Sequence, residues 1–177
     1  MKFTETKLRG AFVIDPERFD DARGFLARSF SAREFEARGL NPRAAECNIS
    51  FSERKHTVRG MHFQRKPHAQ SKLVRCTAGA IYDVIIDLRP GSETFAQWIG
   101  AELTAENRRL LYVPEGFAHG FQTLADDTEV FYQIGDYYAP ASEGGVRWDD
   151  PAFGIDWPER ERVVINERDR GYPDFRP

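Results

Sequence analysis

The chain has 177 residues, of which 41% are hydrophobic and 30% charged, with a formal net charge of −3. This length predicts one domain over residues 1–177, and the composition excludes a disordered chain. The near balance of charge excludes nucleic-acid binding through bulk positive charge. No apolar run is long enough to span a membrane, and the N-terminal residues lack the apolar stretch of a signal peptide. We therefore expect no membrane or nucleic-acid partner.

Cysteine usage bears on the compartment. Cys47 and Cys76 are too few for a disulfide framework, and their spacing is not that of a metal site. Two buried or partly buried thiols fit a reducing compartment, so the sequence predicts a cytoplasmic protein.

Short runs rich in β-branched and aromatic residues recur along the chain, separated by glycine, proline and aspartate. One helix signal is clear, because Ser31 and Glu34 have capping-box spacing and Gly39 follows as a stop. One helical turn is also expected at 103–107. The segment from Gly144 onward looks irregular but carries tryptophans that should anchor it. The predicted strands are 11–14, 24–30, 48–51, 57–63, 72–77, 80–88, 95–103, 110–113, 120–124 and 128–134. Many short strands with almost no helix predict an all-β sandwich or barrel.

Two of the four histidines lie in unusual local sequences. His62 follows Gly60 in a β-type run, where a glycine permits close backbone approach, and His119 lies in a turn that leads into a strand. A metal site needs three or four converging ligands, and the run around His62 lacks a second histidine at the alternate position. We therefore predict no metal. No Walker A motif, dinucleotide fingerprint or nucleophile elbow occurs in the chain.

Two further residues have side chains suited to chemistry. A buried Lys72 would be a fixed cation able to stabilise an oxyanion, and Tyr132 would be a proton donor. Taken alone, each also fits an ordinary role in a strand.

A set of ordered motifs covers almost the whole chain. They read DARGF at 21–25, NIS at 48–50, VRGMHFQ at 58–64, QSKLV at 70–74, DVIIDLR at 83–89, SETF at 92–95, PEGFAHGF at 114–121, DYY at 136–138, WDDP at 148–151 and IDWP at 155–158, followed by Asp169. In this order and composition the chain resembles the dTDP-4-dehydrorhamnose 3,5-epimerase family.

The resemblance implies a cupin-type double-stranded β-sheet (jelly-roll) barrel with short peripheral helices, usually assembled as a homodimer. It also implies an isomerase that acts on a nucleotide-linked 4-keto-6-deoxyhexose without metal or organic cofactor. The C3 and C5 protons of such a sugar flank the C4 ketone, so enolisation makes them acidic. The reaction then needs a base, an oxyanion stabiliser and an acid on the opposite face.

Matching the family's motifs assigns a role to particular residues. His62 matches the base, Asp169 the carboxylate that orients it, Lys72 the cation beside the C4 oxygen, and Tyr132 the acid. A histidine titrates close to neutral pH, which suits a base. The positions that match substrate contacts are Arg23, Asn48, Arg59, His119, Tyr138, Glu143 and Arg168, together with the nucleotide-site positions Arg28 and Glu46.

Two of these positions depart from the family pattern. Arg28 stands where glutamate is common in the family, and Glu46 where glutamine is common. These two differences leave open whether the nucleotide is dTDP, which is the default, or CDP. Arginine offers only donors and glutamate only acceptors, a pattern that complements cytosine. The other readings kept open are an enzyme that inverts only C3 or only C5 and a non-catalytic sugar-nucleotide-binding cupin. A metal-dependent oxygenase is disfavoured by the missing second histidine, and a 3,4-ketoisomerase by the motif around His62.

Overall fold

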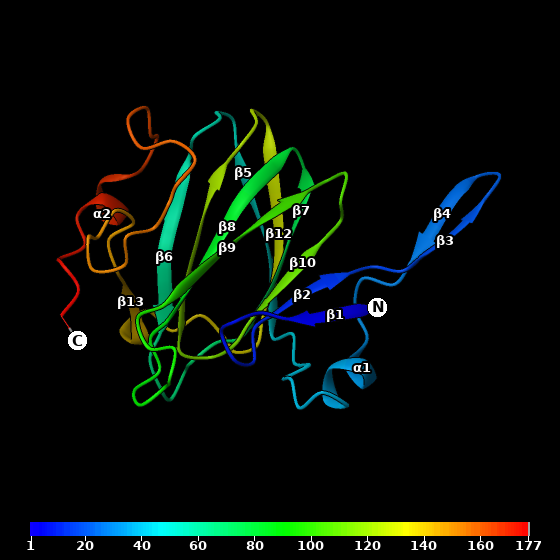
Figure 1. Ribbon diagram of the computed structural model, residues 1–177, viewed down its shortest axis with the longest axis horizontal. Helices are drawn as coiled ribbons and strands as arrows, with labels where there is room; N and C mark the ends of the chain where they lie inside the picture. The colour runs from blue at the N-terminus through cyan, green and yellow to red at the C-terminus, as the bar shows by residue number, and fades with distance from the viewer. Residues whose placement is uncertain (177) are drawn as a thin grey trace.

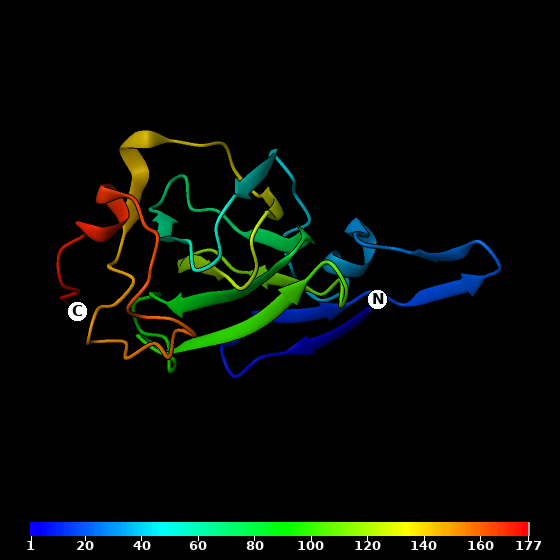
Figure 2. The same cartoon turned by 90° about the horizontal axis from the view of Figure 1, so that it is seen from above.

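The computed structural model describes residues 1–176 as two antiparallel sheets that face each other and a separate hairpin (Figures 1 and 2). The larger sheet has six strands, in the spatial order β1 (Lys2–Glu5), β2 (Phe12–Asp15), β10 (Leu110–Val113), β7 (Lys72–Ala78), β12 (Thr128–Ile134) and β5 (Glu46–Ser52). The second sheet has five, in the order β13 (Glu143–Gly145), β6 (Val58–Gln64), β11 (Phe117–Thr123), β8 (Ala80–Asp87) and β9 (Trp98–Thr104). This is the expected all-β jelly-roll barrel.

The remaining elements are short and peripheral. The helices are α1 (Ala32–Glu36) and α2 (Glu167–Arg170), with one 3-10 turn at Pro140–Ser142. The hairpin of β3 (Arg18–Asp21) and β4 (Gly24–Ala27) extends away from the barrel (Figure 1). Within residues 1–176, no helix has the length and hydropathy needed to cross a membrane.

Alternation along the strands divides the side chains between the barrel interior and its outer faces. On β8, Ile81 and Ile85 belong to the interior core, whereas Val84 and Ile86 belong to a second core on the outside of the five-stranded sheet. The C-terminal segment covers that outer face, as expected from its tryptophans. Trp148 and Trp157 are both 5% exposed, and the indole of Trp157 donates to the Trp148 carbonyl at 2.7 Å.

The local predictions differ from the structure at several points. Residues 103–107 form no helix, because β9 continues to Thr104 and a turn follows. Helix α1 is present and ends before Gly39, which has a φ of +69°, but Ser31 makes no side-chain cap. Strands β1, β3 and β13 and helix α2 were not predicted. Cys47 is exposed, rather than buried or partly buried as expected, because it lies on the outward face of β5.

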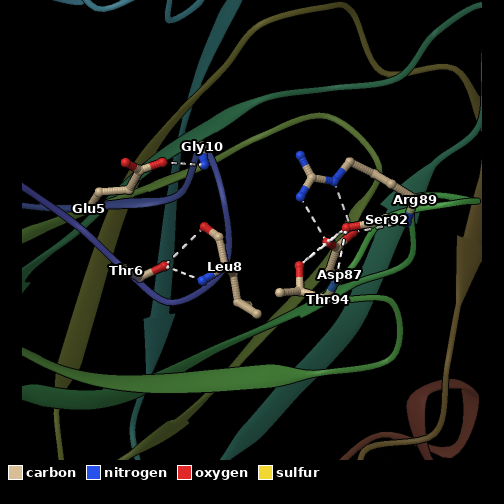
Figure 3. A network of polar contacts seen from close by, with 8 residues as sticks. All are labelled: Glu5, Thr6, Leu8, Gly10, Asp87, Arg89, Ser92 and Thr94. Atoms are coloured by element: carbon tan, nitrogen blue, oxygen red, sulfur yellow. Dashed lines mark hydrogen bonds and ion pairs between the residues drawn. The ribbon is translucent and has the colours of Figure 1, made fainter.

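Two polar turns lie side by side at one end of the barrel (Figure 3). In the first, the Glu5 carboxylate accepts from the amide of Gly10 at 3.0 Å. In the second, the buried Asp87 carboxylate accepts from Arg89 Nη2 at 2.7 Å, Ser92 Oγ at 2.6 Å and Thr94 Oγ1 at 2.7 Å. Burial would raise the pKa of Asp87, but these hydrogen bonds outweigh it and lower that pKa to about 2.

Asp87→Asn should therefore destabilise the fold in a pH-dependent way. The folded-state pKa lies below the unfolded one, so the carboxylate stabilises the protein above about pH 4 and loses this effect as the pH falls towards 2. Urea unfolding at pH 7 should show a loss of about 2 kcal/mol, shrinking at pH 3.

The matched control is Asp20→Asn on the hairpin, where the ion pair with Arg18 is exposed and should contribute less than about 0.5 kcal/mol. An Asp87→Asn effect of equal size at both pH values would contradict the assigned role of the carboxylate.

Candidate active site

A β-bulge in β6 sets the direction of the residue that the motifs assign as the base. His62 pairs with His119 of β11, but Arg59 pairs with Phe121, so β6 has one more residue than β11 between these pairs. The extra residue follows Gly60, whose φ is +129°, and a Cβ there would lie 2.5 Å from the Gly120 Cα. Only glycine fits this close approach. The bulge leaves Met61 in the outer core and turns His62 towards the interior cavity.

The C-terminal helix brings a buried carboxylate to the same place. Asp169 of α2 is 2% exposed, and its Oδ1 lies 2.8 Å from His62 Nε2. Its Oδ2 accepts from the Gly60 amide at 3.0 Å, and Asn166 caps the helix by accepting from the Asp169 amide. Burial would raise the pKa of Asp169, yet the hydrogen bonds from His62 and Gly60 lower it below its usual value. This bond fixes which ring nitrogen of His62 faces the carboxylate and which faces away.

The facing sheet supplies two more groups to the cavity. Lys72 begins β7, and burial lowers its pKa to about 8 against the opposing charges of Asp83 and Glu143. Tyr132 of β12 packs against the interior core, and burial raises the pKa of its hydroxyl. A lysine in this position remains largely cationic at neutral pH, and the tyrosine holds its proton.

These groups surround a cavity of about 300 Å³. Its lining residues are Glu46, Asn48, His62, Phe63, Gln64, Gln70, Lys72, Tyr132, Ile134, Tyr138 and Glu143. Seven of the predicted site residues are among them. Because His62 enters from the five-stranded sheet and Tyr132 from the six-stranded sheet, a ring between them would meet an imidazole and a phenol from opposite sides.

A polar network forms the rim of this cavity. Tyr138 donates its hydroxyl to Glu143 Oε2 at 3.0 Å, and its amide donates to Glu46 at 3.3 Å. Arg168 pairs with the other Glu143 oxygen and donates to the Tyr172 hydroxyl at 3.2 Å. The hydrogen bond to Glu143 raises the pKa of Tyr138. Arg168 is thus brought to the site through Glu143.

His119 lies behind the cavity lining rather than in it. Its side chain is 7% exposed, and its Nε2 lies 2.8 Å from Asp83 Oδ1. Burial lowers the pKa of His119, although Asp83 opposes this. The sequence predicted that His119 lines the cavity, whereas the structure places it behind the lining residues.

The three remaining arginines lie at or beyond the mouth. Arg59 reaches back to β5, donating to the Phe51 carbonyl at 2.7 Å and to Ser52 Oγ at 3.2 Å. Arg23 lies at the tip of the projecting hairpin, paired with Asp21. Arg28 follows β4 and has Glu34, 3.9 Å away, as its nearest carboxylate rather than Glu46. Neither Arg23 nor Arg28 lines the cavity of its own chain.

Sequence reasoning missed several lining residues and one buried carboxylate. Gln64 and Gln70 lie inside the quoted motifs, and their amides donate to the carbonyls of His68 and Asp136, which holds the loop leading to Tyr138. Asp83 also lies in a quoted motif, and its alternation with Ile81 and Ile85 was the available signal. In the described part of the chain, no group of three or more His, Cys, Asp or Glu side chains is placed to hold a metal ion.

Comparison with known proteins gives one family. The model of the dTDP-4-dehydrorhamnose 3,5-epimerase family matches residues 5–177. A dTDP-4-dehydrorhamnose 3,5-epimerase from Sinorhizobium fredii is 42% identical over 173 residues, 98% of this chain and 89% of the relative.

Two solved structures are similar over almost the same extent. The enzyme of the same name from Bacillus anthracis, crystallised with TDP and PPi bound, superposes with a TM-score of 0.94 at 42% identity, covering 98% of this chain and 99% of that one. The dTDP-6-deoxy-D-glucose-3,5-epimerase of Legionella pneumophila, in complex with dTDP-4-keto-L-rhamnose, gives 0.88 at 39% identity, covering 95% and 89%. With the fold, the site and the sequence in agreement, the chain belongs to the dTDP-4-dehydrorhamnose 3,5-epimerase family of isomerases.

Proposed function

We propose that this protein epimerises dTDP-4-dehydro-6-deoxy-D-glucose to dTDP-4-dehydro-L-rhamnose, using its own side chains without metal or organic cofactor. The observation that carries the proposal is the entry of His62 and Tyr132 into one cavity from opposite sheets, with Lys72 beside them. Inversion at carbon needs a base and an acid on opposite faces of the ring, and this arrangement supplies both.

The proposed steps follow from the positions of the three groups. His62 removes the proton on the carbon next to the C4 ketone, and Asp169 stabilises the resulting imidazolium across the 2.8 Å contact. The electron pair moves onto the C4 oxygen, where the Lys72 ammonium stabilises the enolate. Tyr132 then protonates the same carbon from the other face. The cycle closes when His62 returns its proton to solvent and Tyr132 regains one. The same steps at the second carbon that flanks the ketone complete the inversion of both C3 and C5.

The rim of the cavity would hold the rest of the substrate. Arg59 and Arg23 are proposed to bind the diphosphate, since guanidinium groups pair with phosphate oxygens in bidentate fashion. The sugar and the nucleobase would be contacted by Asn48, Tyr138, Glu143 and Arg168. His119 lies behind the lining and would support the side chains that contact the substrate. The choice of dTDP rests on the relatives crystallised with TDP and with a dTDP-sugar. A nucleotide-sugar substrate and two free cysteines favour the cytoplasm as the site of action.

His62→Ala should abolish both epimerisation and solvent exchange at C3 and C5, because His62 is the only base in the proposed steps. Tyr132→Phe should lose about 10²–10⁴-fold in epimerisation while retaining part of the exchange, since His62 can still remove and return a proton on one face. NMR of the dTDP-linked 4-keto sugar in deuterium oxide follows both carbons at once.

The same experiment separates the alternatives. Label at C3 alone or C5 alone identifies a single-site epimerase, and binding without any exchange identifies a non-catalytic cupin. Near-native turnover by a folded His62→Ala variant would refute the assignment of the base.

We also propose that the protein is a homodimer in which each hairpin completes the partner's site. The hairpin is exposed except at Ala27, which is half-buried, and Phe19 and Leu26 are 70% and 74% exposed. On the barrel, the edge strand β5 exposes Ile49 at 67%. A second copy that covers both surfaces removes this apolar area from water and protects the open edge. Arg23, remote from its own cavity, would then lie at the other copy's cavity.

Mixing two inactive variants should restore activity if the hairpin serves the partner. His62→Ala disables the barrel of one chain and Arg23→Glu disables the hairpin of the other, so each heterodimer keeps one intact site. Random exchange of chains should give about one quarter of native activity. Light scattering of the native protein should give about twice the 20.3 kDa chain mass.

The control mixture pairs His62→Ala with Tyr132→Phe, two changes in the same cavity, and should recover no intact site. Absence of recovery in the first mixture, or a stable active monomer, would contradict the shared site.

The preference for one nucleobase is tested by calorimetry with nucleoside diphosphates. We expect dTDP to bind more tightly than CDP, because two relatives were crystallised with TDP and with a dTDP-sugar. Arg28→Glu should leave that order unchanged, because the carboxylate nearest to Arg28 in its own chain is Glu34, so Arg28 has a partner without the nucleobase. If instead CDP binds about tenfold more tightly and Arg28→Glu reverses the order, the charge pattern of Arg28 and Glu46 reads cytosine.

A further inference from the structure

Tyr172 is an aromatic residue of the C-terminal segment that has no part in the steps described above. It follows the end of helix α2 at Arg170 by two residues. Its ring lies in an edge-to-face arrangement with His62, with the ring centroids 6.2 Å apart and the ring planes at 69°. Aromatic rings at this separation and angle attract each other. Tyr172 therefore contacts the proposed base, although it is not among the residues that line the cavity.

Strand β13 explains why the ring of Tyr172 reaches His62. Gly145, the last residue of β13, pairs with His62 of β6, and residues paired in this way project side chains to the same face of the sheet. A Cβ on Gly145 would lie 2.2 Å from Cζ of Tyr172. The phenol ring thus fills the place beside His62 that a side chain at position 145 would take.

The contact with Tyr172 adds a second restraint on the imidazole of His62. Burial opposes ionisation of Asp169, but the hydrogen bonds from His62 and Gly60 lower the pKa of this carboxylate, so it is ionised at neutral pH and accepts from Nε2 of His62. A single hydrogen bond holds one atom of the ring, and the ring can still tilt about that atom. The edge-to-face contact limits this tilt and keeps Nδ1 in one direction.

The hydroxyl of Tyr172 belongs to a different set of contacts. It accepts from Nε and Nη2 of Arg168 at 3.3 and 3.2 Å. Arg168 also pairs with Glu143, whose other oxygen accepts from the Tyr138 hydroxyl at 3.0 Å. The phenol oxygen therefore helps to hold the Arg168 guanidinium at the rim of the cavity. One side chain thus contacts the proposed base through its ring and a proposed substrate contact through its hydroxyl.

We propose that Tyr172 is a positioning residue whose ring keeps the imidazole of His62 directed at the reacting carbon and whose hydroxyl keeps Arg168 at the substrate-binding rim. This inference rests on the proposed function. Tyr172 touches no reacting atom in it and acts through its two neighbours. Loss of the ring should therefore change kcat, and loss of the hydroxyl should change KM.

Two substitutions at position 172 separate these effects. Tyr172→Leu removes the ring, and kcat should fall about tenfold or more, because the base is no longer held in one orientation. Solvent exchange at C3 and C5 should fall by the same factor as epimerisation, since His62 removes the proton in both. Tyr172→Phe keeps the ring and should restore kcat, while KM stays about threefold to tenfold above the native value because Arg168 has lost an acceptor.

Phe175→Leu is the matched control in the same segment. Phe175 packs against Phe153 and Phe95, with centroids 4.9 and 6.1 Å apart, on the outside of the five-stranded sheet. This variant should lose stability and keep the native kcat and KM. A loss of kcat in Phe175→Leu as large as that in Tyr172→Leu, or in Tyr172→Phe as large as in Tyr172→Leu, would overturn the proposal.

Gly145→Ala tests the same contact from the other strand. The added Cβ would displace the ring of Tyr172, so kcat should again fall about tenfold. In combination with Tyr172→Leu the loss should be smaller than the product of the two single losses, because the displaced ring is already absent. Losses that simply multiply contradict the proposal. Should Tyr172→Leu fail to fold, a native kcat in Gly145→Ala would by itself overturn it.

A measurement without substrate separates this inference from the proposed function. With ¹⁵N-labelled histidine, the four histidines of the chain can be followed by NMR, and the His62 signals are identified by their loss in His62→Ala. The Nε2 proton of His62 should exchange with solvent about threefold or more faster in Tyr172→Leu than in the native protein, and at the native rate in Tyr172→Phe. Equal exchange rates in the native protein and Tyr172→Leu would refute the positioning role, whether or not epimerisation is found.

Discussion

The carboxylate of Asp169 joins helix α2 to strand β6, and the position of His62 in the site depends on this contact. Its two oxygens bind the amide of Gly60 and the ring of His62, both more than 100 residues earlier in the sequence. One hydrogen bond thus stabilises the β6 bulge and the other orients the side chain that the bulge turns inward. If either were missing, His62 would lose its fixed tautomer or its direction into the cavity. The C-terminal segment is therefore part of the site as well as a cover for the outer core.

The barrel interior changes from apolar to charged along its length. Aliphatic and aromatic residues from both sheets fill one part, including Val74, Leu111 and Phe121. In the other part the same alternating positions carry Lys72 and Tyr132. The packed part holds the sheets at a fixed separation, so the distance between His62 and Tyr132 is set by the core and not by loops. The open part can then hold ionisable groups whose pKa values depend on burial.

The sequence predicted the interior residues of the site better than its boundary. Lys72 and Tyr132 lie in continuous strands, where period-two alternation and the motifs agree on the inward direction. Gly60 within a β-type run indicated close backbone approach, which the bulge confirms. The position of the bulge, however, depends on pairing with β11, and no local pattern records that register. The short helix that carries Asp169 was also not predicted, since four residues between turns give almost no periodic signal.

The hairpin shows a different limit of sequence reasoning. The motif around Arg23 implied a contact with substrate, yet Arg23 lies at the tip of the β3–β4 hairpin, which projects from the barrel (Figure 1), and is not among the residues that line the cavity. A motif records that a residue is needed at a site, but it does not record which copy of the chain supplies it. Exposed Phe19 and Leu26 are the observation behind the proposed contact between the hairpin and a second copy of the chain.

Strand β8 illustrates how environment rather than residue type divides structural from chemical roles. Asp83 and Asp87 lie four residues apart on one face of the strand, and neither is exposed. Around Asp87 the chain turns back and places Arg89, Ser92 and Thr94 within hydrogen-bond distance, so the charge is neutralised where it lies. Around Asp83 the neighbours are Ile81, Ile85 and His119, which lies 2.8 Å from one carboxylate oxygen, and the other oxygen has no hydrogen-bond partner among the described residues. A carboxylate whose oxygens are all bonded by its own turn contributes mainly stability. A carboxylate left partly unsatisfied in a low-dielectric interior is costly to bury, and here its one partner is His119, directly behind the lining of the cavity.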